Sequence, residues 1–532
     1  MTNAALRGKP DAGNPHVAPS HRYGGTSRFD EGEVAPAATP RRGSLHYNIS
    51  RLDFLKSALA SLGLVAAGGT GGRLFAAPPG WSHGGVPNLV FGVVSDTHLR
   101  TTVDGKYSTG YWSDKWLVAA FRCFRDNNVD AVLHLGDMAH TGQVAEMEFH
   151  ATAWRKVFPN DLAPDGRKVE RLFVAGNHDL DGTKYGIGEL VKKLYPDPGE
   201  FARHVLCTDI AGNWERIWGE PYAEVWHKEV KGYHFFGRHY AGTDYDASEA
   251  KTLALVNEID AKCSLAKDKK PFFHFSHIKT HAAFNKAMAP YRNAVGFFGH
   301  WHASASNWSV IRMWSSGPSI HCPSCAPMGG NSLQPDTCKW AKAPFEKSSP
   351  DVLGRNRQGY IVRVYDDMAV FERHEFGKGG KIGADWIMPL GKYDPHPFAR
   401  QELVKEIGTP QFREGAKLGV ECVNPENPAD SANGEVVRVT IPLADGNPKC
   451  RVFAYDVAVS GKPVKCVFAT GCNMGMGHEP NGGVTTLEIA RSALPPGDAL
   501  AFDVRPRSSL GTCGAPIYAT LPNQENKKGT QT

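Results

Sequence analysis

The sequence predicts an α/β core followed by a smaller, all-β C-terminal domain. Predicted strands and helices alternate from Leu89 to about Glu375, which is the pattern of an α/β protein. After about Pro397 the pattern changes to short strand-like runs separated by Gly, Pro and Asn, as in a β-sandwich. With 532 residues, of which 41% are apolar and 22% charged, the chain has the length and composition of a globular protein with more than one domain.

The first 80 residues carry no core pattern. Residues 1–47 are rich in Gly, Pro, Ser and Arg without apolar periodicity, so we expect a disordered tail. Residues 48–80 run from basic through mildly apolar to small side chains, which is the order of a secretory signal. Phe54-Leu55-Lys56 resembles the twin-arginine export signal, with Leu52 at the position of its second arginine. We therefore expect an exported, periplasmic or extracellular protein; a membrane anchor, or a helix of the fold in a cytoplasmic protein, is the alternative.

The α/β core begins with a strand over Leu89–Val94, whose uninterrupted apolar side chains are typical of a strand buried on both faces. Further strands are expected over Ala131–Leu135 and Arg171–Ala175. Apolar side chains at helical spacing predict two intervening helices. The first helix contains Trp116, Ala120 and Phe124 and has Ser113 as its expected N-cap. The second contains Met147, Ala151 and Trp154.

The segment from Asp181 to Gly232 is less regular and contains a group of large aromatic side chains, Trp214, Trp218, Tyr222 and Trp226. We interpret it as an insertion packed by its own aromatic residues, with a substrate-contacting lid as the alternative. The strand pattern then resumes, and two alternating runs around Asp366-Asp367 predict a closing hairpin. The expected elements are strands Tyr233–His239, Pro271–Phe275, Ala294–Phe298, Gly359–Tyr365 and Met368–Glu375, and a helix over Ser248–Ala266. We assign residues 86–395 to this domain.

Residues 400–525 form the predicted C-terminal β-sandwich. Its expected strands are Val436–Pro442, Arg451–Val459, Val464–Ala469, Val484–Ala490 and Ala499–Val504. A spacer or lid-supporting module and a carbohydrate-binding or surface-binding module are both consistent with this sequence. The chain has 11 cysteines, and either disulfides in an oxidising compartment or reduced thiols agree with that number. Cys322 and Cys325 have the spacing of a zinc-binding pair, but the sequence has no second C-x-x-C pair to complete such a site.

The formal charge of +5, from 60 basic and 55 acidic residues, is small for this length and argues against a surface for long nucleic acids.

Polar side chains follow the ends of five predicted core strands, several of them directly after a glycine that permits a tight turn. They are Asp96 and His98; Asp137; Asn177, His178 and Asp179; His277; and His300 and His302. The carboxyl ends of strands in an α/β sheet meet at one edge, so we expect these side chains to converge. Buried polar groups need partners, and a pair of divalent or trivalent metal ions would provide them. Carboxylates, imidazoles and an amide oxygen suit Mn, Fe or Zn.

This ordered set of motifs resembles the calcineurin-like metallophosphoesterases. They read Asp96-x-His98, Gly136-Asp137, Gly176-Asn177-His178-Asp179, His277 and Gly299-His300-x-His302. The resemblance implies a four-layer sandwich of mixed sheets flanked by helices. It implies that Asp96, His98, Asp137 and His302 bind one metal ion and that Asp137, Asn177, His277 and His300 bind the other, with Asp137 bridging. His274 and His281 are the alternatives to His277.

The resemblance also implies a metal-dependent phosphoesterase that hydrolyses a phosphomonoester or phosphodiester. A hydroxide bridging the two ions would attack phosphorus, and His178 would protonate the leaving oxygen as general acid. Asp179 would either orient His178 or cap the turn. We expect a small or lipid-linked phosphate ester as substrate, near a membrane or cell surface, and leave the oligomeric state open. The alternatives are a catalytically inactive binding or surface protein on the same fold, and a nuclease.

Overall fold

The computed structural model describes residues 85–100, 114–184, 188–325, 357–377, 380–391, 395–423, 435–446, 452–470, 483–497 and 499–522. The predicted tail, the predicted signal segment and the predicted N-cap at Ser113 lie outside these residues. Among the helices within the described ranges, none has both the length and the apolar character needed to cross a bilayer.

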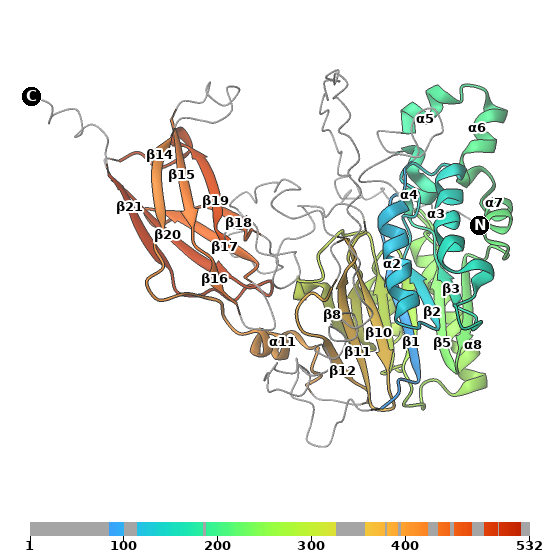
Figure 1. Ribbon diagram of the computed structural model, residues 1–532. Helices are drawn as coiled ribbons and strands as arrows, with labels where there is room; N and C mark the ends of the chain where they lie inside the picture. The colour runs from blue at the N-terminus through green and yellow to red at the C-terminus, as the bar shows by residue number, and fades with distance from the viewer. Residues whose placement is uncertain are drawn as a thin grey trace, which may run out of the picture. The chain divides into compact units, whose positions relative to one another are not determined.

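The first of two six-stranded sheets has the strand order β12-β11-β10-β1-β2-β3 (Figure 1). The strands β1, β2 and β3 are parallel and form one half of the sheet, and β10 pairs antiparallel with β1 on the side away from β2. The hairpin of β10 and β11 is the predicted closing hairpin, and it pairs in register from Gln358–Glu375 to Val364–Ala369. The strands are β1 (Leu89–Val94), β2 (Ala131–His134), β3 (Glu170–Phe173), β10 (Gln358–Val364), β11 (Met368–Glu375) and β12 (Trp386–Pro389).

The second sheet has the order β4-β5-β6-β7-β9-β8, in which β5, β6, β7 and β9 run parallel. Its outermost strands, β4 and β8, pair antiparallel with β5 and β9. The strands are β4 (Val225–Val230), β5 (Tyr233–Arg238), β6 (Phe272–Ser276), β7 (Ala294–Phe298), β8 (Ile311–Trp314) and β9 (Gly317–His321).

The two sheets face each other across an aromatic core. Side chains alternate between the faces of a strand, so Phe91 of β1 points towards the second sheet. Its ring centroid lies 5.5 Å from that of Phe235, 4.9 Å from Phe273 and 6.0 Å from Phe297. The opposite face of β1 packs against helices through a separate apolar cluster that includes Phe121. Burial on both faces explains why β1 lacks an alternating polar pattern.

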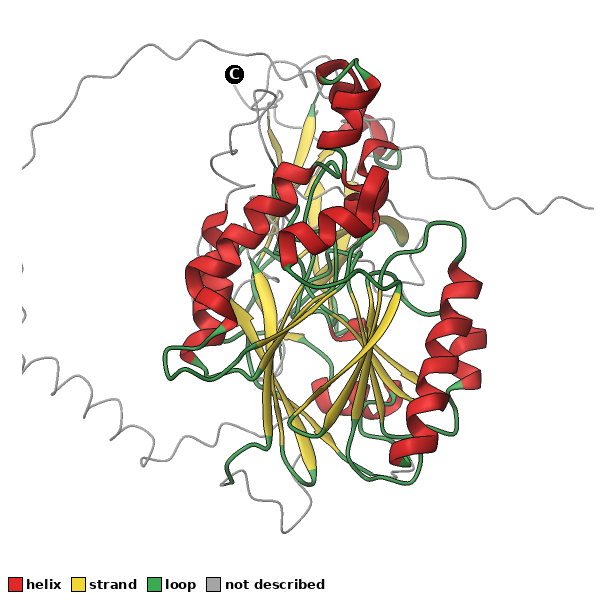
Figure 2. Ribbon diagram, turned by 90° about the vertical axis from the view of Figure 1, so that its right-hand side faces the viewer, coloured by secondary structure: helices red, strands yellow, loops and turns green. Residues whose placement is uncertain are grey.

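Helices cover the outer face of each sheet (Figure 2). The predicted α/β fold with four layers is therefore confirmed. The helix α3 begins with a capping box between Gln143 and Glu146. The described helices are α2 (Asp114–Asp126), α3 (Val144–Val157), α4 (Asn177–Asp181), α5 (Gly188–Leu194), α6 (Pro198–His204), α7 (Ile210–Trp218), α8 (Tyr245–Cys263), α9 (Ala282–Ala287) and α11 (Arg400–Ile407).

In the segment predicted as an insertion, aromatic residues pack on one another as expected, with the ring centroid of Trp214 6.1 Å from that of Trp218 and 6.0 Å from that of Tyr222. The segment differs from the sequence-based interpretation in two respects. Its last part is β4, which pairs along its whole length with β5 and so belongs to the second sheet. Its aromatic residues also pack on the main core: the ring centroid of Trp218 is 5.1 Å from that of Phe173, and that of Trp226 is 5.4 Å from Phe275. Aromatic spacing along the chain could not reveal these partners, because they lie far away in sequence.

The C-terminal region is strand-rich, as predicted, and its described strands pair antiparallel. One sheet has the order β14-β15-β19 and another the order β18-β17-β20-β21, with β13 and β16 forming a short pair. The strands β13, β14, β16 and β21 were not predicted. The elements are β13 (Gln411–Phe412), β14 (Gly419–Val423), β15 (Val436–Ile441), β16 (Ala444–Asp445), β17 (Ala454–Val459), β18 (Lys462–Phe468), β19 (Thr485–Ala490), β20 (Ala499–Arg507) and β21 (Ile517–Pro522).

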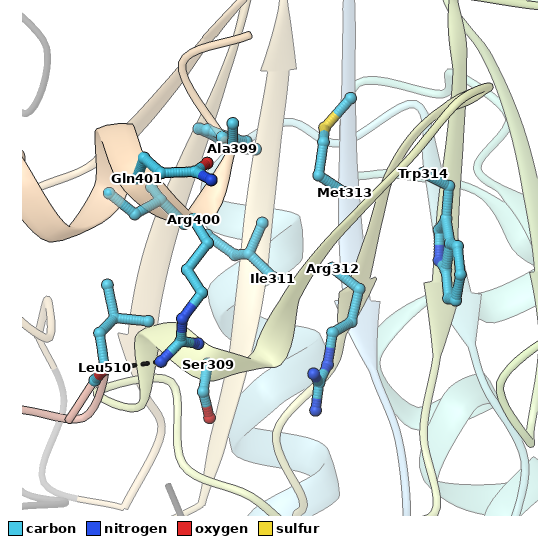
Figure 3. A pocket seen from close by; sticks show the side chains of 11 residues that line it. Ser309, Ile311, Arg312, Met313, Trp314, Ala399, Arg400, Gln401 and Leu510 are labelled. Atoms are coloured by element: carbon cyan, nitrogen blue, oxygen red, sulfur yellow. Dashed lines mark hydrogen bonds between the residues drawn. The ribbon is translucent and has the colours of Figure 1, made fainter. Parts of the chain in front are cut away.

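A pocket of about 380 Å³ lies beside the edge strand β8 (Figure 3). It is lined by β8, by residues at the start of α11 and by Leu510, whose carbonyl accepts a 2.7 Å hydrogen bond from Arg400. The side chains of Arg312 and Trp314 extend to one side of β8 and that of Met313 to the other, as strand geometry requires. None of the predicted site residues lines this pocket.

Candidate metal centre

The predicted site residues lie on loops that leave the ends of the central strands. Asp96 and His98 follow β1, Asp137 follows β2, His277 follows β6, and His300 and His302 follow β7. Five of these six have a positive φ, at 51° for Asp96, 45° for His98, 53° for Asp137, 72° for His300 and 51° for His302. Left-handed backbone is uncommon for residues other than glycine and is typical of functional sites. The loops therefore bend sharply enough to turn each side chain back over the sheet edge.

Two glycines allow the loops to approach one another. A Cβ atom at Gly176 would lie 2.2 Å from Asp137 Oδ1, which is far inside van der Waals contact. Gly136 has a φ of +94°, and a Cβ there would lie 2.7 Å from the backbone nitrogen of Gly176. The glycine in each motif is therefore required by the close packing of the β2 and β3 loops.

One group of donor atoms is formed by Asp96, His98 and His302. His98 Nε2 lies 3.0 Å from His302 Nε2, and His302 Nε2 lies 3.3 Å from Asp96 Oδ1. His98 Nε2 is also 3.5 Å from Asp137 Oδ2. These atoms come from both sheets and point at a common position.

A second group is formed by Asp137, His277 and His300. His277 Nε2 lies 3.1 Å from Asp137 Oδ2 and 3.3 Å from His300 Nδ1. Asp137 Oδ2 is thus close to a histidine of each group, which is the arrangement expected of a bridging ligand. Asn177, the first residue of α4, is buried, and the next backbone N–H, that of His178, donates a 2.8 Å hydrogen bond to Asp137 Oδ1.

The electrostatics of these groups suit bound cations. Burial alone would raise the pKa of the Asp137 carboxyl, but His277 and His178 outweigh burial and hold that pKa well below its usual value. Burial lowers the pKa of His277, yet Asp137 more than offsets burial and raises it to about 9, so this position favours positive charge. Burial and His277 lower the pKa of His300 to about 4, which keeps its imidazole neutral, as a metal ligand must be. Carboxylates and neutral imidazoles in two adjoining groups fit a pair of transition-metal ions.

Of the three candidate histidines near β6, the structure brings only His277 into these groups. His274 is a buried residue of β6, and burial together with Arg238 lowers its pKa to about 4. His281 Nδ1 instead lies 3.1 Å from Asp246 Oδ1 and 3.4 Å from Glu249 Oε2.

His178 lies beside the first group, and its ring centroid is 4.5 Å from that of His98. Its Nδ1–H donates a 2.7 Å hydrogen bond to the His140 carbonyl, which fixes the orientation of the ring. Asp179 accepts hydrogen bonds from the backbone N–H groups of Ala139 and Gly176 at 2.7 Å and of Met138 at 3.3 Å. These contacts match the turn-capping alternative for Asp179, because all three join it to the β2 and β3 loops.

Sequence reasoning missed His140. Its Nδ1 lies 3.3 Å from His98 Nδ1, and His98, His140 and His178 form a further group of neighbouring imidazole nitrogens. The available signal was a histidine three residues after Asp137 in the same loop. The sequence analysis selected polar residues at the ends of predicted strands, and His140 lies further along its loop, so it was not selected.

The sequence model described as calcineurin-like phosphoesterase matches residues 89–304. Solved structures similar to the chain include a dimetal phosphatase from Danio rerio, which is 13% identical, with 57% of this chain and 100% of that chain covered and a TM-score of 0.33. They also include a purple acid phosphatase from yellow lupin (Lupinus luteus) seeds, which is 13% identical, with 57% of this chain and 54% of that chain covered and a TM-score of 0.33. A search of curated protein sequences found no match. From its family match, the region spanning residues 89–304 belongs to the calcineurin-like phosphoesterases.

Proposed function

We propose that this protein is a phosphoric ester hydrolase that depends on two metal ions. The observation that carries the proposal is the position of Asp137, whose Oδ2 lies 3.5 Å from His98 Nε2 in one group of donors and 3.1 Å from His277 Nε2 in the other. A carboxylate shared between two sets of imidazoles is what two adjacent ions require. The family match of residues 89–304 supports the same reaction class.

The residues divide into two sets of ligands. Asp96, His98, Asp137 and His302 would hold one ion, and Asp137, Asn177, His277 and His300 the other. When bound, such ions activate a water molecule as nucleophile and neutralise charge on the phosphoryl oxygens. We leave their identity open among Mn, Fe and Zn, since the mixed donor set suits all three.

His178 is proposed as the general acid that protonates the leaving oxygen. Because its Nδ1–H is held by the His140 carbonyl at 2.7 Å, the proton to be transferred would be carried by Nε2. The backbone N–H of the same residue donates to Asp137 Oδ1, which ties the position of the acid to that of the bridging ligand. Asp179 would support both loops through the three backbone N–H groups that it accepts.

The proposed substrates are phosphomonoesters or phosphodiesters of small molecules, including lipid-linked ones, acted on outside the cytoplasm. Export is proposed from the signal-like residues 48–80 alone. A comparison of aryl monoesters, aryl diesters and lipid-linked diphosphates as substrates would separate these classes.

The decisive experiment combines metal analysis with hydrolysis of an aryl phosphate. Purified protein is expected to contain two metal ions per chain and to release the aryl alcohol. Asp137→Asn should lose both properties. Asp126→Asn, which changes a carboxylate that is 63% exposed beside Arg125, should lose neither. Stoichiometric metal without hydrolysis of any ester would instead support the inactive binding protein.

A further inference from the structure

His134 is a fully buried histidine at the end of β2 and is outside both groups of donor atoms. Both of its ring nitrogens have hydrogen-bond partners. The backbone N–H of Gly136 donates to Nδ1 at 3.2 Å, and Nε2 lies 3.2 Å from Thr97 Oγ1. Because Nδ1 accepts a hydrogen bond, the ring proton is on Nε2, and Nε2–H donates to the Thr97 hydroxyl. The Thr97 hydroxyl then donates towards the carbonyls of Asp137 and Met138, at 3.5 and 3.4 Å.

The two partners of His134 belong to the loops that carry three of the proposed ligands. Thr97 stands between Asp96 and His98, and Gly136 directly precedes Asp137. The loops also pair through backbone bonds, from Asp96 N–H to the Gly136 carbonyl at 3.0 Å and from His98 N–H to the Asp137 carbonyl at 2.9 Å.

All three ligands on these loops have left-handed backbone, with φ between 45° and 53°. Such conformations persist only where the surroundings hold them. The His134 ring is itself held by edge-on packing, with ring centroids 4.6 Å from His150 and 5.9 Å from Phe173. A ring that cannot turn, bonded to both loops, fixes the distance between them.

We propose that His134 is a positioning residue of the metal centre. It binds the Asp96–His98 loop through Thr97 and the Asp137 loop through Gly136, and so presets the spacing of Asp96, His98 and Asp137 for the ions. The inference rests on the proposed function, since it concerns the same centre, but its effect is on metal affinity and can be measured without turnover.

The test is titration of the metal-stripped, full-length protein with Mn²⁺ by calorimetry, together with the Tm of the metal-free form. His134→Met removes both hydrogen bonds while keeping the site filled, and should weaken Mn²⁺ binding at least tenfold. Thr97→Val should weaken it similarly, whereas Thr97→Ser, which keeps the hydroxyl, should bind as the wild type does. The double variant His134→Met/Thr97→Val should bind no more weakly than the weaker single variant, because both interrupt one connection.

His150→Met is the matched control. His150 is as buried as His134 and packs against it, but among the described residues neither of its ring nitrogens has a hydrogen-bond partner. Methionine at position 150 keeps the space beside His134 filled, so both hydrogen bonds of His134 to the loops should stay in place. His150→Met should change the Tm without changing Mn²⁺ affinity. If His134→Met lowers the Tm as His150→Met does and leaves Mn²⁺ affinity unchanged, His134 is merely structural and the proposal is overturned. If His134→Met does not fold, Thr97→Val against Thr97→Ser decides by the same criterion.

Failure of the inference is distinguishable from failure of the proposed function. A wild type that binds two Mn²⁺ and hydrolyses no ester contradicts the function and leaves the positioning role to be judged from the affinities. A wild type that hydrolyses esters, with His134→Met binding Mn²⁺ normally, contradicts only the positioning role. If the wild type binds no Mn²⁺, the same titrations are made with Zn²⁺ and Fe²⁺, and a wild type that binds none of the three overturns both.

Discussion

Replacing Gly176 by alanine should displace Asp137, the proposed bridging ligand, because the added Cβ would lie 2.4 Å from its backbone nitrogen and closer still to its carboxylate. The backbone of Gly176, with φ −100° and ψ −172°, is accessible to alanine, so only the added Cβ matters. That Cβ would stand 2.2 Å from Asp137 Oδ1, whereas real Cβ atoms essentially never approach other atoms closer than 3.0 Å. The two groups must therefore separate by at least the 0.8 Å difference. The Asp137 carboxylate has little room to move, because the His178 N–H binds Oδ1 and His277 lies beside Oδ2.

A misplacement of about 1 Å at a reacting centre can cost about 100-fold in rate. We expect Gly176→Ala to lower kcat/KM on an aryl phosphate by about that factor and to reduce the bound metal measured by elemental analysis. Gly212→Ala is the control, because its Cβ would lie 2.3 Å from Asp209 Oδ2, a similar clash at the exposed start of α7. There the capping carboxylate can turn into solvent, at a cost of about 1 kcal/mol and no loss of activity. Gly176→Ala with two ions and a rate within about threefold of wild type would refute the role assigned to Asp137.

The other predictions concern the acid, the ions and the sheet behind them. His178→Ala should retain both ions and lose about 10²- to 10⁴-fold in rate on esters with poor leaving groups, but much less on activated aryl esters; loss of metal would instead make His178 a ligand. Removing the ions with a chelator should lower the Tm. Restoring Mn²⁺ to about 100 times its Kd should return about 2.7 kcal/mol of stability for each occupied site, measured by thermal unfolding, whereas an unchanged Tm would contradict a metal centre. Burial would raise the pKa of Glu372, but His374 and Arg363 outweigh burial and lower it from 4.5 to about 2. A carboxyl whose pKa is lower in the folded than in the unfolded protein stabilises the fold at pH values above its unfolded pKa, so this contribution, at most about 3 kcal/mol, should be present above pH 4.5 and lost as the pH falls towards 2. The free energy of unfolding of Glu372→Gln should therefore depend less on pH between these values. A pH profile like that of the wild type would contradict the assignment.

The sequence predicted the central part of the fold and the gathering of the site because both follow local rules. The bounds expected for the strands Ala294–Phe298 and Met368–Glu375 are those of β7 and β11. Continuous apolar runs identify buried strands, and parallel strands release their C-terminal residues at one edge. That rule was applied to five strand ends. From four of them, six of the named residues have donor atoms that lie 3.0 to 3.5 Å from a neighbouring donor.

What the sequence could not predict depends on contacts between distant segments. The strand β4 belongs to the second sheet because it pairs with β5, and its half-buried residues show no pattern from which that pairing could be predicted. Thr97, His134 and His140 do not stand out in the sequence. Thr97 is a small residue between two proposed ligands, His134 belongs to an apolar strand, and His140 does not directly follow a strand. Their importance appears only when the β1 and β2 loops are seen side by side.

The donor atoms of each proposed ion site come from both sheets. Asp96, His98 and Asp137 follow β1 and β2, whereas His277, His300 and His302 follow β6 and β7. A bound ion would therefore act as a cross-link between the two layers. It would add to apolar contacts, such as that of Phe91 with Phe273, and to hydrogen bonds, such as that from the Tyr360 hydroxyl to the His321 carbonyl. Amide hydrogens in β1 and β6 should then exchange with solvent more slowly in the metal-loaded protein, even far from the ions, because separating the layers would require the coordination bonds to break first.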